Sequence, residues 1–124
     1  MLLGAATIFT VRDLAASVAH YRDVLGFTVT FQYGEPAFYA CLCRDEVAIH
    51  LRAGTRRPPG NGAIAVFAND VDALHGELIA REANVLKPPQ DYAYGMRDFN
   101  VADPDGNELT FGMETQLGEA NKPN

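Results

Sequence analysis

An order of predicted elements that occurs twice along the chain is the strongest constraint on its fold. Residues 7–11 are mostly β-branched and aromatic, which predicts a strand, and an apolar stripe at helical spacing follows them. Three more strand-like segments complete the first half, and residues 62–68 then begin the same β-α-β-β-β order again. The two predicted helix starts, VRDLAA and ANDVDA, also resemble each other. The sequence therefore predicts an internal repeat of roughly half the chain.

Both predicted helices have a capping residue and one apolar face. Asp13 can accept a hydrogen bond from a free amide of the first helix, and Gly26 can end that helix. Asn69 or Asp70 can cap the second helix. The apolar faces comprise Leu14, Val18, Tyr21 and Leu25 in the first helix and Val71, Leu74 and Leu78 in the second. Each helix is therefore expected to cover one face of a sheet, as in α+β proteins.

Turn-forming residues separate the remaining segments and mark them as strands. The predicted strands cover residues 27–33, 37–43 and 47–53 in the first half and 83–89, 96–103 and 108–114 in the second. Pro88 and Pro89 are expected to stop the strand in which they lie, because proline has no amide hydrogen for a sheet ladder. Residues 116–124 are polar and predicted to form a flexible tail.

A two-residue turn at residues 45 and 46 would determine which side chains share a face of the first sheet. Such a turn pairs Arg44 with Val47 and Cys41 with His50. Alternation then predicts one face with Tyr39, Cys41, Cys43, Ala48, His50 and Arg52, and faces of the second half with Ala63, Ala65 and Phe67 and with Glu108, Thr110 and Gly112. Small and aromatic residues with few polar groups are typical of a small-molecule site.

Composition and charge argue against several classes of function. The net charge is −6, which is unfavourable for a protein that follows a nucleic-acid backbone. No apolar run approaches the roughly 20 residues that span a bilayer, and the first residues lack the basic segment of an export signal. A cytoplasmic location is therefore expected, where Cys41 and Cys43 would be reduced thiols.

Three segments carry a resemblance to a known superfamily: VRDLAASVAHYRDVLGF at 11–27, RDEVAIHL at 44–51 and YGMRDFNVADPDGNELTF at 94–111. With the doubled βαβββ order, they resemble the vicinal oxygen chelate superfamily, which includes glyoxalase I, extradiol dioxygenases, and fosfomycin and bleomycin resistance proteins. The resemblance covers nearly all of residues 5–114. It implies an α+β fold in one domain, residues 1–115, with two tandem βαβββ modules at about 5–54 and 60–114. Their curved mixed sheets would surround a cleft.

The resemblance also marks four positions that hold metal ligands in the metal enzymes of this superfamily. They correspond here to Ala6, His50, Ala63 and Thr110. Alanine has no lone pair to offer a metal, and a threonine hydroxyl is a poor replacement for a carboxylate. His50 and Glu108, which is expected to share the face of Thr110, are the residues left for a reduced metal site. These departures imply a metal-free protein without a cofactor.

The same departures resemble the bleomycin resistance proteins, which are metal-free homodimers that sequester a drug at the subunit interface without catalysis. Phe31, Tyr39 and Tyr94 match aromatic positions of that group, although YGMRDF carries one extra residue next to Tyr94. The resemblance therefore implies a homodimer that binds a planar or aromatic antibiotic of the bleomycin type. The residues expected to contact the ligand are Phe31, Tyr39, Cys41, His50, Arg52, Tyr94, Met96 and Thr110.

The same residues also allow other interpretations. His50 could be a core histidine hydrogen-bonded to a neighbour, and Phe31 and Tyr39 could be core aromatics. A Cys41–His50 pair could form a reactive thiolate, although no third group is expected to orient it. The chain could also be a superfamily enzyme of the glyoxalase, thiol transferase or dioxygenase type, acting through His50 with or without a metal. A structural or interaction domain is the third alternative, since one fold hosts many functions.

Overall fold

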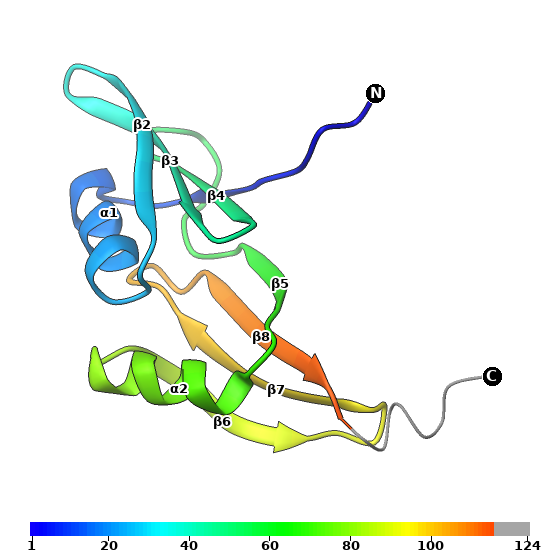
Figure 1. The fold of residues 1–124 in the computed structure, drawn as a ribbon. Coiled ribbons are helices and arrows are strands. Elements are labelled where there is room, and N and C mark those ends of the chain that lie inside the picture. The colour runs from blue at the N-terminus through cyan, green and yellow to red at the C-terminus, as the bar shows by residue number, and fades with distance from the viewer. Residues whose placement is uncertain (116–124) are drawn as a thin grey trace.

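The computed structural model describes residues 1–115, so the flexible tail predicted for 116–124 lies outside the described residues. The elements follow in the order β1 (Thr7–Thr10), α1 (Leu14–Asp23), β2 (Thr28–Gly34), β3 (Ala37–Arg44), β4 (Val47–Arg52), β5 (Ala63–Phe67), α2 (Val71–Ala80), β6 (Asn84–Asp91), β7 (Met96–Ala102) and β8 (Glu108–Glu114). This is the predicted β-α-β-β-β order, repeated once (Figure 1).

Within the described residues, the strands form two four-stranded sheets with the orders β1-β4-β3-β2 and β5-β8-β7-β6. β1 runs parallel to β4 and β5 parallel to β8, whereas the other neighbours are antiparallel, so both sheets are mixed. We call β1 to β4 with α1 module 1, and β5 to β8 with α2 module 2. Figure 1 shows both helices on the same side of the molecule. The predicted α+β fold of two tandem modules is confirmed.

Both helices begin with a side-chain cap, as the sequence predicts. Asp13 Oδ1 accepts a hydrogen bond from the amide of Ala16 at 3.1 Å, and Asp70 Oδ1 accepts one from the amide of Ala73 at 3.0 Å. Of the two candidates at the second helix, Asp70 is therefore the cap. Gly26, beyond the end of α1, has a φ of +77°, which favours glycine. Among residues 1–115, no helix is long and apolar enough to cross a membrane.

The prediction that Pro88 and Pro89 end a strand is wrong. β6 continues through both prolines to Asp91. It is the edge strand of its sheet and pairs with β7 alone. The register shifts between Lys87 and Gln90, so the prolines lie in an irregular stretch where a missing amide hydrogen removes no ladder hydrogen bond. The local sequence pattern did not show that this segment lies at a sheet edge.

Strand alternation gives each sheet one face against its helix and one face turned away from it. The predicted hairpin register of module 1 is confirmed, because Arg44 pairs with Val47 and Cys41 with His50. Four residues of β3 and β4 on the helix side are buried, and they are Ala40, Leu42, Ile49 and Leu51. Together with buried residues of module 2, they belong to a common hydrophobic cluster.

The turn between β7 and β8 joins the two modules. Asp103 is 4% exposed, and its Oδ1 accepts hydrogen bonds from the amides of Asp105 and Asn107, each at 2.9 Å. Its Oδ2 accepts from Asn107 Nδ2 and from the hydroxyl of Tyr21, also at 2.9 Å. Asn107 Nδ2 donates in addition to the carbonyl of Thr10 at 3.1 Å. The DPDGN segment, expected to be a turn, therefore also attaches module 2 to α1 and β1.

Candidate ligand-binding site

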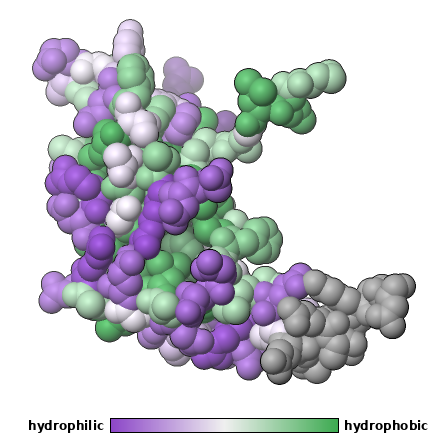
Figure 2. All heavy atoms as spheres, in the orientation of Figure 1, coloured by the Kyte–Doolittle hydropathy of each residue, from purple (hydrophilic) through white to green (hydrophobic). Residues whose placement is uncertain are grey.

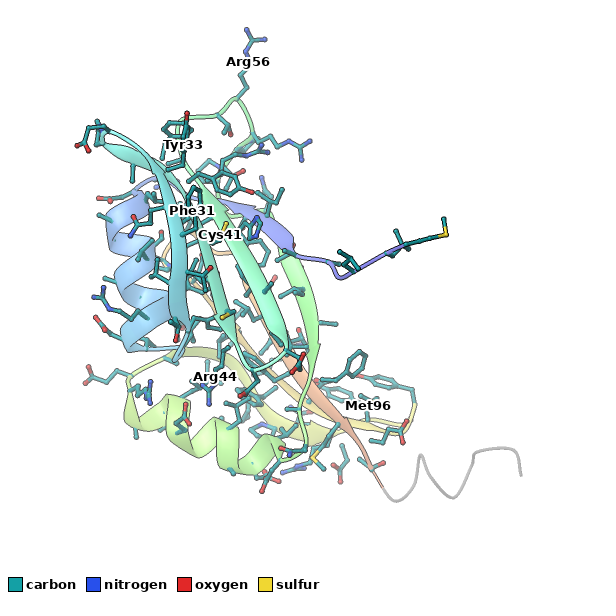
Figure 3. All side chains as sticks on the ribbon, turned by 45° about the horizontal axis from the view of Figure 1, so that its top comes forward. Phe31, Tyr33, Cys41, Arg44, Arg56 and Met96 are labelled. Carbon is teal, nitrogen blue, oxygen red and sulfur yellow. The ribbon has the colours of Figure 1, made fainter. Side chains whose placement is uncertain are left out.

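The side of the module 1 sheet opposite α1 brings together five of the residues predicted to bind ligand. Cross-strand pairing places Ile8, His50, Cys41 and Phe31 in one row and Thr10, Arg52, Tyr39 and Tyr33 in the next. We call this surface the module 1 face. Figure 3 shows Phe31 and Cys41 close together on this sheet. The predicted residues on it are Phe31, Tyr39, Cys41, His50 and Arg52.

A hydrogen-bonded pair of rings lies on the module 1 face. The hydroxyl of Tyr39 and Nδ1 of His50 are 2.8 Å apart, and the rings meet edge to face with centroids separated by 5.5 Å. If the phenol donates, Nε2 of His50 carries the proton, and if Nδ1 donates, Nε2 is an acceptor. His50 is half-buried, so it is a member of the open face and not a fully buried core histidine.

The remaining polar groups of the module 1 face differ in whether they have a hydrogen-bond partner. Cys41 and Cys43 are half-buried free thiols. No hydrogen bond among residues 1–115 joins Cys41 to His50, so the paired register does not by itself make a reactive thiolate. Arg52 has a buried Nε without a hydrogen-bond partner in the described part of the chain. Arg52 is therefore the residue of this face that most needs an acceptor.

The side of the module 2 sheet opposite α2 combines small residues with a polar pair. Thr110, a predicted ligand-binding residue, lies between Ala65 on β5 and Asn100 on β7. Asn100 Nδ2 donates to Glu108 Oε1 at 3.1 Å, whereas Asn100 Oδ1 is buried without a partner among residues 1–115. We call this surface the module 2 face. Its members are Ala63, Ala65, Phe67, Met96, Asp98, Asn100, Glu108, Thr110 and Gly112.

The far end of the module 2 face is built around Gly112, which lies close to Met96 and Asp98. Gly112 lies between Phe67 on β5 and Asp98 on β7. A Cβ built on Gly112 would lie 3.3 Å from Cε of Met96 and 3.4 Å from Cβ of Asp98. The hydroxyl of Tyr94 donates to Asp98 Oδ2 at 2.9 Å, and burial together with this hydrogen bond raises the pKa of Tyr94. The predicted residues Tyr94 and Met96 therefore both lie at this end.

Several residues of the two faces were not among those predicted to bind ligand. Phe67 is 80% exposed, and Tyr92 stacks on Tyr94 with ring planes 4° apart and centroids separated by 5.2 Å. Alternation along β7 would have placed Asp98 and Asn100 on this face, so a sequence signal existed for them. Tyr92 lies in the loop between β6 and β7, where no periodicity applies.

A single chain keeps the predicted residues in two separate sets. Figure 3 shows Phe31 on module 1 and Met96 at the far end of module 2. Both faces expose large apolar side chains, since Phe31 is 56% exposed and Phe67 80%. In Figure 2, apolar residues occupy the hollowed side of the molecule, whereas polar residues dominate the opposite edge. Monomeric proteins rarely leave such apolar surfaces uncovered without a functional reason.

A cavity between the modules contains an ion pair that links them. The cavity has a volume of about 550 Å³ and lies where the β3–β4 turn meets the start of α2. Arg44 donates hydrogen bonds of 2.7 and 3.0 Å to the carboxylate of Glu77 and one of 2.9 Å to the carbonyl of Leu25. The hydrogen bonds from Arg44 hold the pKa of Glu77 below its usual range. Figure 3 shows Arg44 between α1 and α2.

The positions that the superfamily uses for metal ligands do not fit a metal centre in this chain. Ala6 is an exposed residue just before β1, and Ala63 begins β5. Neither alanine offers a donor atom, and Thr110 offers a neutral hydroxyl. Among residues 1–115, no group of three or more His, Cys, Asp or Glu side chains is placed to hold a metal ion.

Comparison with known proteins agrees with this geometry. The Glyoxalase/Bleomycin resistance protein/Dioxygenase superfamily matches residues 5–111. The bleomycin resistance protein of Geobacillus stearothermophilus is 27% identical over 131 residues, covering 89% of this chain and 96% of that protein. The bleomycin-binding protein from bleomycin-producing Streptomyces verticillus, solved with copper(II)-bleomycin, is 29% identical with a TM-score of 0.75, covering 90% of this chain and 95% of that one. TioX from Micromonospora sp. ML1 shares the fold, with a TM-score of 0.80, 19% identity, and coverage of 91% and 99%. Because the superfamily match spans both βαβββ modules, this chain belongs to the glyoxalase/bleomycin resistance protein/dioxygenase superfamily.

Proposed function

We propose that the protein is a metal-free homodimer that binds and sequesters a planar or aromatic antibiotic of the bleomycin type. The observation that carries the proposal is the pair of open faces with exposed aromatic side chains, Phe31 on module 1 and Phe67 on module 2. The relatives at 27% and 29% identity are named for bleomycin resistance and bleomycin binding, which supports this ligand class.

A second copy of the chain would cover both faces. The module 1 face of one protomer would lie against the module 2 face of its partner, and two-fold symmetry would repeat that contact to form two equivalent clefts. Covering apolar side chains contributes about 25 cal/mol for each Å² removed from water. Each cleft would then unite the two sets of predicted residues, with Phe31, Tyr39, Cys41, His50 and Arg52 from one protomer and Tyr94, Met96 and Thr110 from the other.

The chemistry of the two faces suits recognition of a planar ring system. Phe31 and Tyr94 offer aromatic surfaces for stacking, and the hydrogen bond to Asp98 holds the Tyr94 ring in place. The small residues of the module 2 face leave room for the ring. His50 Nε2 and the guanidinium of Arg52 supply the few polar contacts that orient a ligand in an otherwise apolar site.

Isothermal titration calorimetry with metal-free bleomycin and with copper(II)-bleomycin tests the ligand. We expect measurable binding without change to the drug. Phe31→Ala and Phe67→Ala should each weaken binding about three- to tenfold, because a lost aromatic contact costs about 0.5–1.5 kcal/mol. Ile79→Ala is the matched control, since Ile79 is a 50% exposed apolar residue of α2, away from both faces. Absence of binding by both forms of the drug would overturn the bleomycin-type assignment.

Analytical ultracentrifugation tests the homodimer. The wild-type protein should sediment as a dimer, and Phe67→Asp should shift it toward the monomer because a carboxylate would be buried in the interface. Ile79→Asp, which places the same charge on α2, should sediment as the wild type does. A monomeric wild-type protein at the concentrations used for titration would contradict the proposed arrangement.

A metal-free enzyme that acts through His50 is the second candidate. The observation in its favour is the Tyr39–His50 hydrogen bond, because a proton on Nδ1 would leave Nε2 free to act as a base. The candidate substrates are a glyoxal–thiol adduct, an epoxide antibiotic and a catechol. Turnover of one of them by the wild type, and loss of that turnover in His50→Gln, would support this candidate. Equal rates for His50→Gln and the wild type would remove it.

A further inference from the structure

Opposite charges lie on the two faces that the proposed dimer brings together. Arg52 is the one arginine in the two described rows that define the module 1 face, and those rows contain no lysine or carboxylate. The charged members of the module 2 face are Asp98 and Glu108, and Lys87 lies next to Asn100 on the edge strand β6. Neither Arg52 nor these two carboxylates take part in the ion pairs found among residues 1–115. The two faces are therefore complementary in charge.

The same faces carry two hydrogen-bonding groups that lack a partner, and these groups are also complementary. Nε of Arg52 is a buried donor and Oδ1 of Asn100 is a buried acceptor, and neither has a hydrogen-bond partner in the described part of the chain. A buried polar group without a partner is costly, and more so when it belongs to a charged side chain. Both side chains are only half-buried, so a change of rotamer can turn each group toward an opposing surface.

Asn100 and Glu108 form a compact acceptor site on the module 2 face. Nδ2 of Asn100 donates to Oε1 of Glu108 at 3.1 Å. This hydrogen bond sets the orientation of the amide, because the reversed amide would place two oxygens together. Oδ1 of Asn100 and the carboxylate of Glu108 can therefore both accept hydrogen bonds from outside the chain. A guanidinium suits such a site, because its N–H donors can reach several acceptors at once.

Strand order places Arg52 and Glu108 at matching positions in the two modules. β4 and β8 each lie next to the strand that begins their module. Arg52 is the last residue of β4, and Glu108 is the first residue of β8. If β4 of one protomer and β8 of the other run antiparallel across the cleft, the end of β4 meets the start of β8. Asp98 lies one strand further on, in β7, and accepts a hydrogen bond from Tyr94.

We propose that Arg52 of each protomer binds the partner's Asn100 and the partner's Glu108 across the cleft. This inference rests on the proposed homodimer and names the side chains that join its two protomers. Two-fold symmetry forms the contact twice, once at each cleft. A guanidinium has five N–H donors, so this contact leaves some of them free for a ligand in the same cleft.

Charge reversal tests whether the contact joins two chains. In a homodimer of Arg52→Glu, or of Glu108→Arg, like charges would meet at both contacts. The dissociation constant of each homodimer, measured by analytical ultracentrifugation, should therefore rise at least about tenfold. An equimolar mixture of the two variants should form a heterodimer with an affinity close to that of the wild type, because both of its contacts join opposite charges.

The matched controls make the same changes of charge away from both faces. Arg22 and Asp23 form an exposed pair on α1. Arg22→Glu and Asp23→Arg should each dimerise as the wild type does. A loss of dimer in these controls equal to that in Arg52→Glu would show that net charge is responsible, and would overturn the contact.

Milder variants test the contact if charge reversal prevents folding, which far-UV circular dichroism would detect. Arg52→Gln and Glu108→Gln keep polar side chains at both positions. Each should weaken the dimer, and the chain that carries both substitutions should lose less than the sum of the two losses, because each removes the same contact. Fully additive losses would overturn the contact.

The outcomes distinguish this contact from the homodimer on which it rests. A wild-type dimer whose charge-reversed variants dimerise equally well would overturn the contact and leave the homodimer in place. Recovery in a chain that carries both reversals, without recovery in the mixture, would place the pair within one chain and also overturn the contact. A wild-type protein that stays monomeric would overturn both proposals.

Discussion

The hydroxyl of Tyr21 in α1 donates a 2.9 Å hydrogen bond to Oδ2 of Asp103, 82 residues further along the chain. Tyr21 is 0% exposed, and burial together with the Asp103 carboxylate raises its pKa, so the phenol is a donor throughout the physiological range. The carboxylate also accepts from Asp105 and from the backbone and side chain of Asn107, which compensates for its burial. This relationship attaches the last turn of module 2 to the helix of module 1.

Tyr21→Phe should destabilise the protein without changing its fold. The substitution leaves the ring in place but removes a donor from a buried carboxylate, which costs about 1–3 kcal/mol. Urea denaturation at pH 7 measures the free energy of unfolding. Tyr33→Phe is the matched control, because Tyr33 is 62% exposed and a phenol there is free to contact water. Equal stabilities of the two variants would show that the Tyr21–Asp103 hydrogen bond does not hold the modules together.

Replacing His20 should flatten the dependence of stability on pH. Burial lowers the pKa of His20, and the negative charge of Asp103 raises it by a smaller amount. The unfolded chain, with a histidine pKa of about 6.5, therefore binds a proton more readily than the folded chain. The free energy of unfolding should therefore be highest above the unfolded-state pKa and should fall as the pH decreases below it. Unfolding free energies of the wild type and His20→Gln between pH 7 and pH 5 would test this, and parallel curves would contradict it.

The Arg44–Glu77 ion pair should contribute to stability with a pH dependence of the same sign, but at lower pH. The hydrogen bonds from Arg44 lower the pKa of Glu77, so the stabilisation is present above the unfolded pKa and is lost as the pH falls through the lower folded value. Both side chains are partly exposed, which limits the expected effect to about 1 kcal/mol or less. Thermal unfolding of Glu77→Gln should show a loss near pH 7 that disappears in strong acid. A constant loss at every pH would show that the charge of Glu77 is not responsible.

Glycine-to-alanine substitutions should have opposite effects at two positions. In the interior of α2, a Cβ on Gly76 would meet no atom of residues 1–115 within 4 Å, so Gly76→Ala should stabilise by about 0.5–1 kcal/mol. Gly60 has a φ of +86°, and a Cβ there would collide with the carbonyl oxygen of Asp105. Gly60→Ala should therefore lower the melting temperature, whereas Gly76→Ala should raise it. A fall in melting temperature for both would contradict the open environment of Gly76.

Local chemistry explains why much of the fold was predictable. The caps Asp13 and Asp70 act on amides three residues away, and the turn at 45 and 46 sets the pairing of Cys41 with His50 through adjacent strands. Alternation then places Tyr39, His50 and Arg52 on one face. The superfamily also followed from short motifs. None of these inferences required knowledge of how the two modules pack.

Contacts between distant residues decided the rest. The continuation of β6 through Pro88 depends on its place at a sheet edge, and the burial of Asp103 depends on Tyr21 in the other module. The separation of Phe31 from Met96, and the lack of an acceptor for Arg52 Nε, also follow from how the sheets are arranged. The amino-acid sequence by itself determined the elements, their faces and the superfamily, because these depend on neighbours along the chain. Tertiary structure decided which polar groups were satisfied and which surfaces stayed open, because those depend on packing between segments that periodicity does not relate.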